Sequence, residues 1–299
     1  MNITANKLKT LLVEGTFLEN ESLKKYSSLH IGGKARYFVL PRNTCELTNI
    51  VAFAKTNKIS YFVLGNGSNV LFSDKGYRGI VICLKQMERN FAVCGETAKI
   101  GAGASLSYLA SKLSNNGFTG LEWAVQIPAS VGGAIQTNAG AFGSDIASIL
   151  LAVTIFDGSN IIKIERKDIE FSYRKCSLSG KGFIILEAEF SIKPCDVNVS
   201  KSRVVELIEI RNASQPKGFS AGCSFLKAGE YSAGALIEKA GLKGKRIGGA
   251  YISSLHANFI INDKNAKSRH IEKLLKICEK QVYNKFGVKL VREIEKIGD

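Results

Sequence analysis

The sequence predicts a protein of the α+β class, and three features of the chain support this prediction. Residues 36–84 combine apolar runs of strand length with one stretch of helical periodicity, which indicates a small, partly parallel sheet. Residues 90–190 contain strand pairs around one helix. The C-terminal residues indicate further helices and a last strand, so both kinds of element are expected throughout the 299 residues.

The N-terminal part is expected to fold as a first subdomain over residues 1–86. Apolar runs of four to eight residues between turn signals are typical of buried strands. The expected elements are a helix at 4–14, a strand at 36–40, a helix at 45–57 with Thr44 as its N-cap, and strands at 61–64, 70–72 and 80–84.

A second subdomain is expected over residues 87–200 and a third domain over 201–299, because the polar run CDVNVSKS after Pro194 indicates a boundary. The second should contain strands at 91–94 and 99–101, a helix at 105–116 that ends at Gly117, and strands at 150–156, 161–165 and 182–190. The third should contain helices at 203–212, 233–240 and 268–286, the last ended by Gly287, and a strand at 288–297.

Residues 120–143, GLEWAVQIPASVGGAIQTNAGAFG, contain no lysine or arginine, which is unusual in a chain with a net charge of +15. Gly132, Gly133, Asn138 and Gly140 suit a backbone that turns sharply and lets a flat ligand lie against its amides. Pro128 fixes one more φ angle. The alternative interpretation is a turn-rich connector between strands.

A second loop of the same chemistry, LGNGSN, includes the end of the expected strand at 61–64. Its residues 65–69 present several N–H groups and small polar side chains together, which suits a pyrophosphate. Two such loops in one chain predict a long anionic ligand such as a dinucleotide.

Composition narrows the class of partner. The charge of +15 invites a nucleic-acid partner, but no block contains five or six like charges, so we favour a basic surface that attracts small phosphorylated substrates. Three histidines and seven scattered cysteines without a CxxC motif predict no metal site, free thiols and a reducing cytosol. No apolar run approaches the roughly 20 residues of a membrane span, and the N-terminus lacks a signal-peptide pattern.

Four residues are candidates for chemistry, each with an ordinary structural alternative. Arg174, in the run FSYRK, could clamp a carboxylate or a developing enolate, although most such arginines are solvated. Cys223 and Ser224 follow Gly222 in a loop and could each carry a proton, but the cysteine could equally be a small buried hydrophobic residue. Glu293 lies in an expected strand, where a glutamate usually belongs to the polar face.

The segments occur in an order that resembles one enzyme family. LGNGSN, IPASVGGAIQTNAGAFG, FSYR, a QP followed by AGCSF, GLKGKRIGG, HANFIIN and REIEKIG follow one another, and the likeness runs from about Ser28 to the last residues. Together they are similar to the UDP-N-acetylenolpyruvoylglucosamine reductase (UDP-N-acetylmuramate dehydrogenase) family, in its shorter type without an extra tyrosine-bearing substrate loop. Other flavoproteins of the vanillyl-alcohol-oxidase type share the first two motifs more loosely.

The resemblance implies a two-subdomain FAD-binding fold of the vanillyl-alcohol-oxidase type plus a C-terminal α+β substrate domain. NADPH would reduce the flavin and leave. Hydride would then pass to the methylene carbon of UDP-N-acetylglucosamine enolpyruvate, in the cytosolic synthesis of peptidoglycan precursors for the bacterial cell wall. The implied cofactor-binding residues are Gly65, Asn66, Gly67, Ser68, Asn69, Ile127, Pro128, Gly132, Gly133, Asn138 and Gly140.

By the same resemblance, Arg174 and Glu293 would stabilise the enolate, and Cys223 would donate the proton that completes the reaction. A thiol has a reference pKa of about 8.5 and is a far better acid than a serine hydroxyl. The family usually continues the donor loop as Phe-Lys-Asn-Pro, whereas FLKA follows here, so a shift of one residue would make Ser224 the donor. Gln126 and Ala129 also stand where the family tends to have glycine.

Two rival functions remain open. Another FAD-dependent oxidoreductase of this fold could act on a sugar, lactone or hydroxy acid, often with flavin tethered to a histidine, and His30 is the one histidine in the N-terminal two thirds of the chain. A non-catalytic basic nucleotide- or RNA-binding module would be colourless, with salt-sensitive affinity for RNA. We expect no nucleic-acid or membrane partner. The sequence leaves the oligomeric state open, with a monomer as the expectation.

Overall fold

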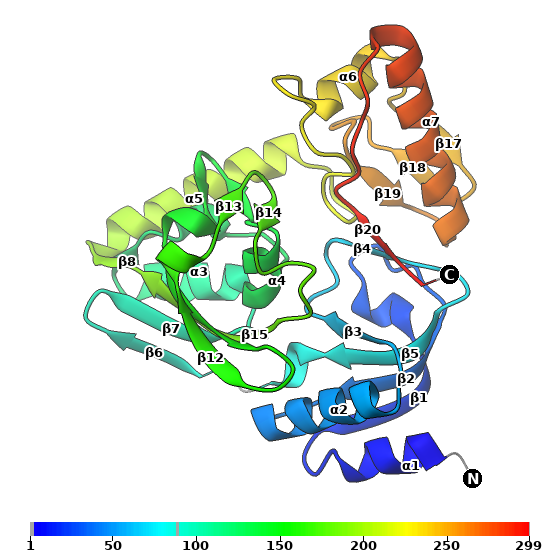
Figure 1. Ribbon diagram of the computed structural model, residues 1–299. Helices are drawn as coiled ribbons and strands as arrows, with labels where there is room; N and C mark the ends of the chain where they lie inside the picture. Colours follow the sequence, from blue (N-terminus) through cyan, green and yellow to red (C-terminus); the bar gives the residue numbers. More distant parts are fainter. Residues whose placement is uncertain (1–2, 88–89, 299) are drawn as a thin grey trace. The chain divides into compact units, whose positions relative to one another are not determined.

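The computed structural model describes residues 3–87 and 90–298, and the chain forms two compact units (Figure 1). Unit 1 consists of Met1–Glu19, Tyr37–Asn66 and Gly79–Ile210, and unit 2 of Asn20–Arg36, Gly67–Arg78 and Arg211–Asp299. Two segments from the N-terminal third therefore belong to the same unit as the C-terminal residues. The three-part division of the chain remains a prediction.

Unit 1 contains most of a small sheet, and two helices pack against this sheet. The strand order is β1 (Thr16–Ser22), β2 (Lys34–Leu40), β5 (Tyr77–Cys83) and β3 (Tyr61–Leu64). Strands β3 and β5 are parallel, so the predicted partly parallel sheet is confirmed. Helices α1 (Ile3–Thr10) and α2 (Thr44–Thr56) bury Leu8, Leu47 and Ile50 in a core shared with Ile80 and Ile82 of the sheet.

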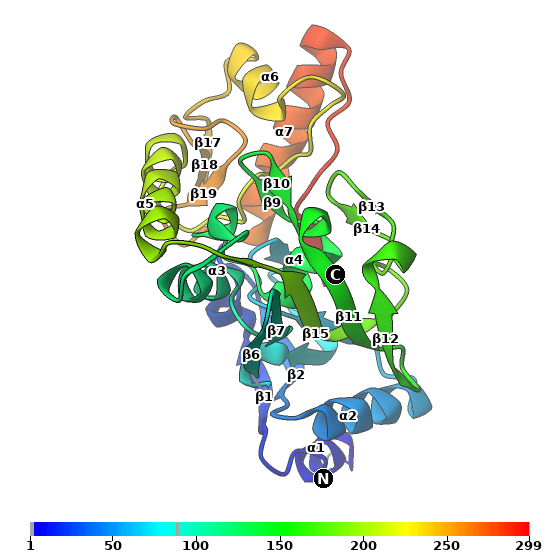
Figure 2. The same ribbon diagram turned by 90° about the vertical axis from the view of Figure 1, so that its left-hand side faces the viewer.

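A five-stranded antiparallel sheet forms the rest of the core of unit 1. Its order is β12 (Ile161–Glu165), β11 (Leu150–Phe156), β15 (Ile184–Ser191), β7 (Thr97–Gly101) and β6 (Phe91–Cys94). Helices α3 (Leu106–Asn115) and α4 (Val131–Gln136) bury Leu109, Val131 and Ile135 in the same core. Helix α4 lies beside β15 (Figure 2).

Short strands and 3₁₀ helices occur between the longer elements along the chain. The short strands are β8 (Phe118–Thr119), β9 (Gly140–Ala141), β10 (Ser144–Asp145), β13 (Phe171–Ser172), β14 (Lys175–Cys176) and β16 (Lys193–Pro194). The 3₁₀ helices are η1 (Leu23–Tyr26), η2 (Leu84–Gln86), η3 (Glu122–Ala124), η4 (Ile146–Ser148) and η5 (Arg166–Asp168).

Helix α5 (Val197–Ser214) begins within the polar run at which we predicted a boundary, so the helix expected at 203–212 starts earlier than predicted. Asp196 acts as its cap, because the Asp196 carboxylate accepts a hydrogen bond from the backbone N–H of Asn198 at 2.7 Å. Ser200 is 1% exposed and faces the rest of unit 1, whereas Lys201 and Ser202 are exposed to solvent. A polar sequence here is therefore the solvated face of a helix.

The cap of α2 also differs from the prediction: the side chain of Asn43, not Thr44, accepts from the N–H of Glu46.

Unit 2 combines small sheets with two helices. Strands β17 (Arg246–Ile247), β18 (Ala250–Ile252) and β19 (Ile260–Asn262) form an antiparallel sheet, and β4 (Val70–Phe72) pairs in parallel with β20 (Glu295–Ile297). Helices α6 (Ala233–Lys239) and α7 (Ser268–Phe286) contribute to the core around Ile271 and Leu274. Gly287 ends α7 with a left-handed φ of 68°, as predicted.

The strand predicted at 288–297 is wrong in extent, because only Glu295–Ile297 form a strand. Residues 291–293 instead pair with a loop at 224–226.

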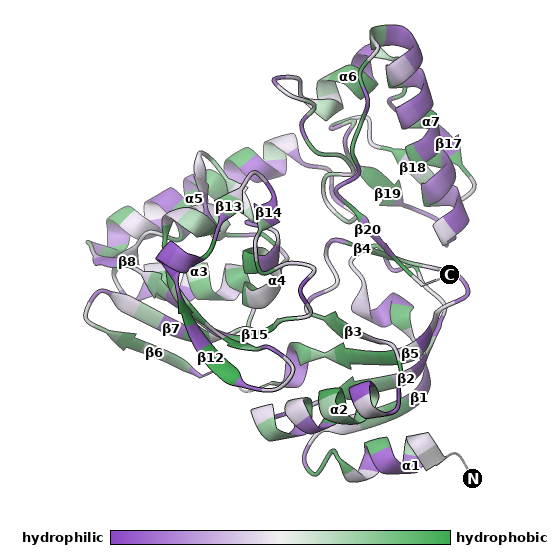
Figure 3. Cartoon of the chain, in the orientation of Figure 1, coloured by the Kyte–Doolittle hydropathy of each residue, from purple (hydrophilic) through white to green (hydrophobic). Residues whose placement is uncertain are grey.

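Figure 3 shows hydrophobic residues in strands such as β5 and a largely polar α7. Within residues 3–87 and 90–298, we find no helix that is both long and apolar enough to span a bilayer.

Candidate active site

The two predicted glycine-rich loops meet within unit 1. The side-chain amide of Asn66 donates a hydrogen bond to the carbonyl oxygen of Pro128 at 3.1 Å, although the residues are 62 positions apart. A Cβ atom on Gly65 would lie 2.1 Å from the Ser130 hydroxyl oxygen, so only glycine allows this approach. The contact brings predicted cofactor residues of both loops together.

Gly132 and Gly133 are not turn residues, because both lie inside helix α4. Ser130 caps this helix by accepting from the N–H of Gly133 at 3.2 Å. A Cβ on Gly132 would lie 3.1 Å from the Cβ of Ala102, so the glycine allows α4 to pack closely on the segment after β7. The turn prediction holds for Asn138, whose φ is 41°, but Gly140 does not have a positive φ.

The second half of the LGNGSN loop belongs to unit 2. Gly67 has a φ of 69°, and a Cβ there would lie 1.9 Å from the carbonyl oxygen of Tyr26. Its own carbonyl accepts from the N–H of Ser28 at 3.0 Å. The side-chain amide of Asn69 donates to the carbonyl of Glu293 at 3.0 Å, so a predicted cofactor residue and a predicted catalytic residue are in contact.

Arg174 lies in the two-residue turn between β13 and β14, where Ser172 pairs with Lys175. Its φ of 56° is left-handed, a conformation that costs an ordinary side chain roughly 1–2 kcal/mol. Its guanidinium donates to the carbonyl oxygens of Asn138 at 3.2 Å and Gly140 at 3.0 Å. These two hydrogen bonds orient the guanidinium. A strained, oriented cation supports the hypothesis of a functional role.

The loop that carries the two candidate proton donors, Cys223 and Ser224, lies beside Glu293 in unit 2; we call it the donor loop. The N–H of Glu293 donates to the carbonyl of Ser224 at 2.9 Å, and the N–H of Leu226 donates to the carbonyl of Val291 at 2.9 Å. On its other side the loop is held by Asn258, whose amide both accepts from the N–H of Phe225 at 3.0 Å and donates to its carbonyl at 2.8 Å. Asn258 is not among the site residues predicted from the sequence. The signal was an amide within the apolar run HANFII.

Accessibility separates the two candidate donors. Ser224 is 1% exposed, and its hydroxyl has no hydrogen-bond partner among the described residues. Cys223 is half-buried and directly follows Gly222, whose φ is 72°. A proton donor must touch its substrate, which favours the accessible thiol. The backbone pairing between residues 224–226 and 291–293 places Ser224 opposite Glu293, so variants of both Cys223 and Ser224 are needed.

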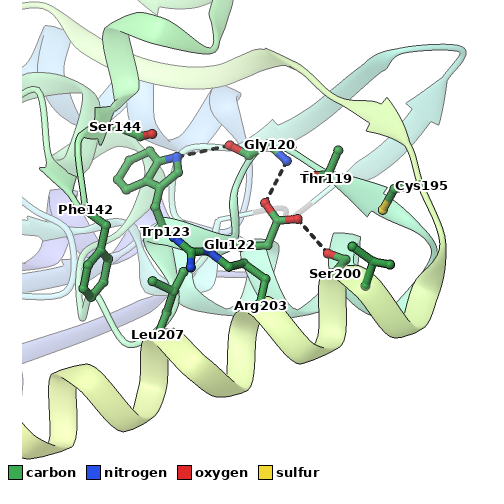
Figure 4. Close-up of a pocket in the computed structure, with 11 residues that line it drawn as sticks. Thr119, Gly120, Glu122, Trp123, Phe142, Ser144, Cys195, Ser200, Arg203 and Leu207 are labelled. Atoms are coloured by element: carbon green, nitrogen blue, oxygen red, sulfur yellow. Dashed lines mark hydrogen bonds between the residues drawn. The ribbon is translucent and has the colours of Figure 1, made fainter.

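A pocket of about 450 Å³ in unit 1 contains none of the predicted site residues (Figure 4). Glu122 lines this pocket, and its carboxylate accepts hydrogen bonds from the Ser200 hydroxyl at 2.7 Å and from the N–H of Gly120 at 2.8 Å. The indole N–H of Trp123 donates to the carbonyl of Gly120 at 3.1 Å (Figure 4). These bonds tie helix α5 to the start of the glycine-rich stretch.

Burial would raise the pKa of Glu122, but hydrogen bonds from Thr119, from its own backbone, from Ser200 and from Gly120 outweigh burial and lower it. Such a carboxylate stabilises the fold fully above its unfolded pKa of about 4.3, and this stabilisation is lost as the pH falls through the folded value. We therefore expect Glu122→Gln to lower the melting temperature at neutral pH, with a difference from the native chain that shrinks in acid. Thermal unfolding across pH measures this. A difference that stays constant with pH would contradict the assignment.

Among the described residues, no cluster of histidine, cysteine and carboxylate side chains is arranged to hold a metal ion.

Two family models match the chain. The model described as FAD binding domain matches residues 35–162. The model described as UDP-N-acetylenolpyruvoylglucosamine reductase, C-terminal domain, matches residues 215–297.

Full-length relatives agree with these matches. A protein named UDP-N-acetylenolpyruvoylglucosamine reductase from Caldanaerobacter subterraneus subsp. tengcongensis is 41% identical over 299 residues, 99% of each chain. A protein of the same name from Caldicellulosiruptor bescii is 42% identical over 287 residues, 95% of this chain and 91% of the relative. The crystal structure of UDP-N-acetylenolpyruvylglucosamine reductase from Thermus caldophilus matches with a TM-score of 0.80 and 32% identity, covering 95% of this chain and 99% of that one.

Proposed function

Because the chain belongs to the UDP-N-acetylenolpyruvoylglucosamine reductase family, we propose that it reduces the enolpyruvyl group of UDP-N-acetylglucosamine enolpyruvate to give UDP-N-acetylmuramate. The protein is an FAD-dependent oxidoreductase of peptidoglycan precursor synthesis, with NADPH as the reductant. The observation that carries this conclusion is the combination, on one chain, of an FAD-binding domain with the C-terminal domain of this family. We place the reaction in the cytosol.

The loops of unit 1 fit a flavin dinucleotide. Gly65 presents bare backbone where a side chain would collide with Ser130, and Asn66 holds the loop against Pro128. When bound, FAD supplies the hydride, taken from NADPH, that adds to the methylene carbon of the substrate. The cofactor-binding roles of residues 65–69, 127–128, 132–133 and 140 remain proposals, and for Gly132 and Gly133 the proposed role is to shape α4.

Hydride addition leaves negative charge on the enolate of the pyruvyl group. Arg174 stabilises this charge, because its guanidinium is held by neutral carbonyls before the charge appears. An interaction that strengthens as the charge develops lowers the barrier more than it tightens substrate binding. Cys223 then protonates the neighbouring carbon, and the thiol is left as a thiolate until solvent restores its proton.

Glu293 completes the stabilisation of the enolate by donating a hydrogen bond when its carboxyl group carries a proton. Its backbone is anchored at the N–H by Ser224 and at the carbonyl by Asn69, so the side chain is carried on a fixed main chain. Substitutions at Glu293 therefore change the side chain without removing the ladder that positions the donor loop.

Glu293→Ala is expected to slow re-oxidation of the reduced enzyme by substrate by about 10²–10³-fold, the usual cost of one lost donor to an oxyanion. Glu293→Gln is expected to retain most of the rate, because the amide N–H still donates. Anaerobic stopped-flow measurement of flavin colour gives both rates. Equal losses in the two variants would mean that the charge or the proton of Glu293, rather than hydrogen-bond donation, is what matters.

The function itself is tested by mixing the holoprotein with NADPH and the enolpyruvyl nucleotide in the absence of oxygen. We expect stoichiometric oxidation of NADPH and formation of UDP-N-acetylmuramate, identified by mass spectrometry. An oxidase of the same fold would instead consume oxygen with a sugar or hydroxy acid, and it would often retain flavin after denaturation. The His30 ring stacks on Phe219 at a centroid distance of 3.8 Å, and we expect denaturation to release the flavin.

A further inference from the structure

The side chain of Asn138 is occupied by contacts within the protein. Its amide nitrogen donates to the Asp145 carboxylate at 3.2 Å and to the carbonyl of Ser172 at 3.2 Å, and its amide oxygen accepts from the N–H of Ala147 at 3.0 Å. An asparagine amide has two donor hydrogens, so both are used. The residue is 4% exposed. Little of this side chain is left to bind a flavin.

The partners of Asn138 form a closed ring with Arg174. Its amide holds the carbonyl of Ser172, which is the last residue before the turn that carries Arg174. Its own carbonyl accepts from the guanidinium of Arg174 at 3.2 Å. Asn138 therefore holds both the base of the arginine's hairpin and the charged head of the arginine, and all of these contacts lie within unit 1.

We propose that Asn138 is a positioning residue for Arg174, in place of the flavin-binding role predicted for its side chain. This inference rests on the proposed function, because it assigns Arg174 to enolate stabilisation. Asparagine suits the position for two reasons. It tolerates the left-handed φ of 41°, and its amide bonds the hairpin and the loop at 145–147 at once.

Asn138→Gly tests the proposal, because glycine keeps the left-handed backbone and the carbonyl while it removes the amide. We expect re-oxidation by the enolpyruvyl nucleotide to slow by about 10–100-fold, the scale of a misplaced catalytic group. Reduction by NADPH and the dissociation constant for FAD should stay within about twofold of the native values, since only the substrate step uses Arg174. Asn265→Gly, at another left-handed asparagine with a φ of 50°, is the matched control and should leave both steps unchanged.

The double variant Asn138→Gly/Arg174→Ala distinguishes positioning from independent action. If Asn138 acts through Arg174, adding Asn138→Gly to Arg174→Ala causes no further loss of the re-oxidation rate. Losses that multiply would overturn the proposal, and so would a parallel loss of FAD affinity, which would indicate a flavin contact. Failure of the native protein itself to be re-oxidised would instead contradict the proposed function.

Asp145→Asn provides a second variant if Asn138→Gly does not fold. One Asp145 oxygen accepts from the N–H of Ser148 at 3.0 Å, so the new amide should direct its NH₂ toward Asn138. That NH₂ cannot accept the hydrogen bond from Asn138. We expect a slower re-oxidation step with unchanged NADPH reduction, in the same direction as Asn138→Gly. An unchanged re-oxidation rate in a folded Asp145→Asn protein would count against the ring.

Discussion

Cys223→Ala is expected to slow re-oxidation of the reduced enzyme by substrate by about 10²–10⁴-fold, the range for loss of a general acid. Reduction by NADPH should keep its native rate, because that step needs no proton from this loop. The loop itself should persist, since it is held by backbone bonds from Leu226 to Val291 and from Glu293 to Ser224. Anaerobic stopped-flow spectroscopy measures the two half-reactions separately.

Two companion variants make this test selective. Cys223→Ser should retain more of the rate than Cys223→Ala, because a hydroxyl at the same position can still transfer a proton, although it is a weaker acid. Ser224→Ala should leave the rate near its native value, because the Ser224 hydroxyl is enclosed. Full turnover in Cys223→Ala together with loss in Ser224→Ala would reverse the assignment.

Arg174→Ala should slow the same step by about 10²–10³-fold through loss of the oriented cation. Arg174→Lys should recover only part of the rate, because an ammonium cannot reproduce the planar fork that bonds the carbonyls of Asn138 and Gly140. NADPH reduction should again be unchanged.

Thermal stability provides the control for these arginine variants. Alanine at a φ of 56° is as strained as arginine, so Arg174→Gly should be the most stable of the series while its re-oxidation by substrate is slowed as much as in Arg174→Ala. A loss of activity that followed the melting temperature would indicate a structural role for Arg174. Equal slowing of both half-reactions would place Arg174 with the cofactor rather than with the substrate.

Long apolar runs made much of the fold predictable. Strands β3, β4, β6, β11 and β12 and helix α7 have the bounds expected from the sequence. The glycine loop at Gly65 was also predictable, because a backbone without side chains is what a close approach requires. Local sequence determines these features, and tertiary contacts reinforce them.

Other features depend on contacts that no local pattern contains. Glycine costs about 1 kcal/mol in a helix, so Gly132 and Gly133 indicated a turn, yet close packing of Gly132 on Ala102 favours helix α4. The start of α5 could not be predicted for a similar reason. Its buried Ser200 donates a hydrogen bond to Glu122, which is 78 residues away in the sequence. The role of Asn138 is set by Ser172, a partner 34 residues away in sequence.

The visible spectrum of the purified protein tests the central claim, that this chain uses bound FAD to carry hydride from NADPH to an enolpyruvyl nucleotide. We predict a yellow protein whose colour NADPH bleaches without oxygen and whose colour UDP-N-acetylglucosamine enolpyruvate then restores. A colourless protein that takes up no added FAD, or a bleached protein that the enolpyruvyl nucleotide does not re-oxidise, would contradict this claim.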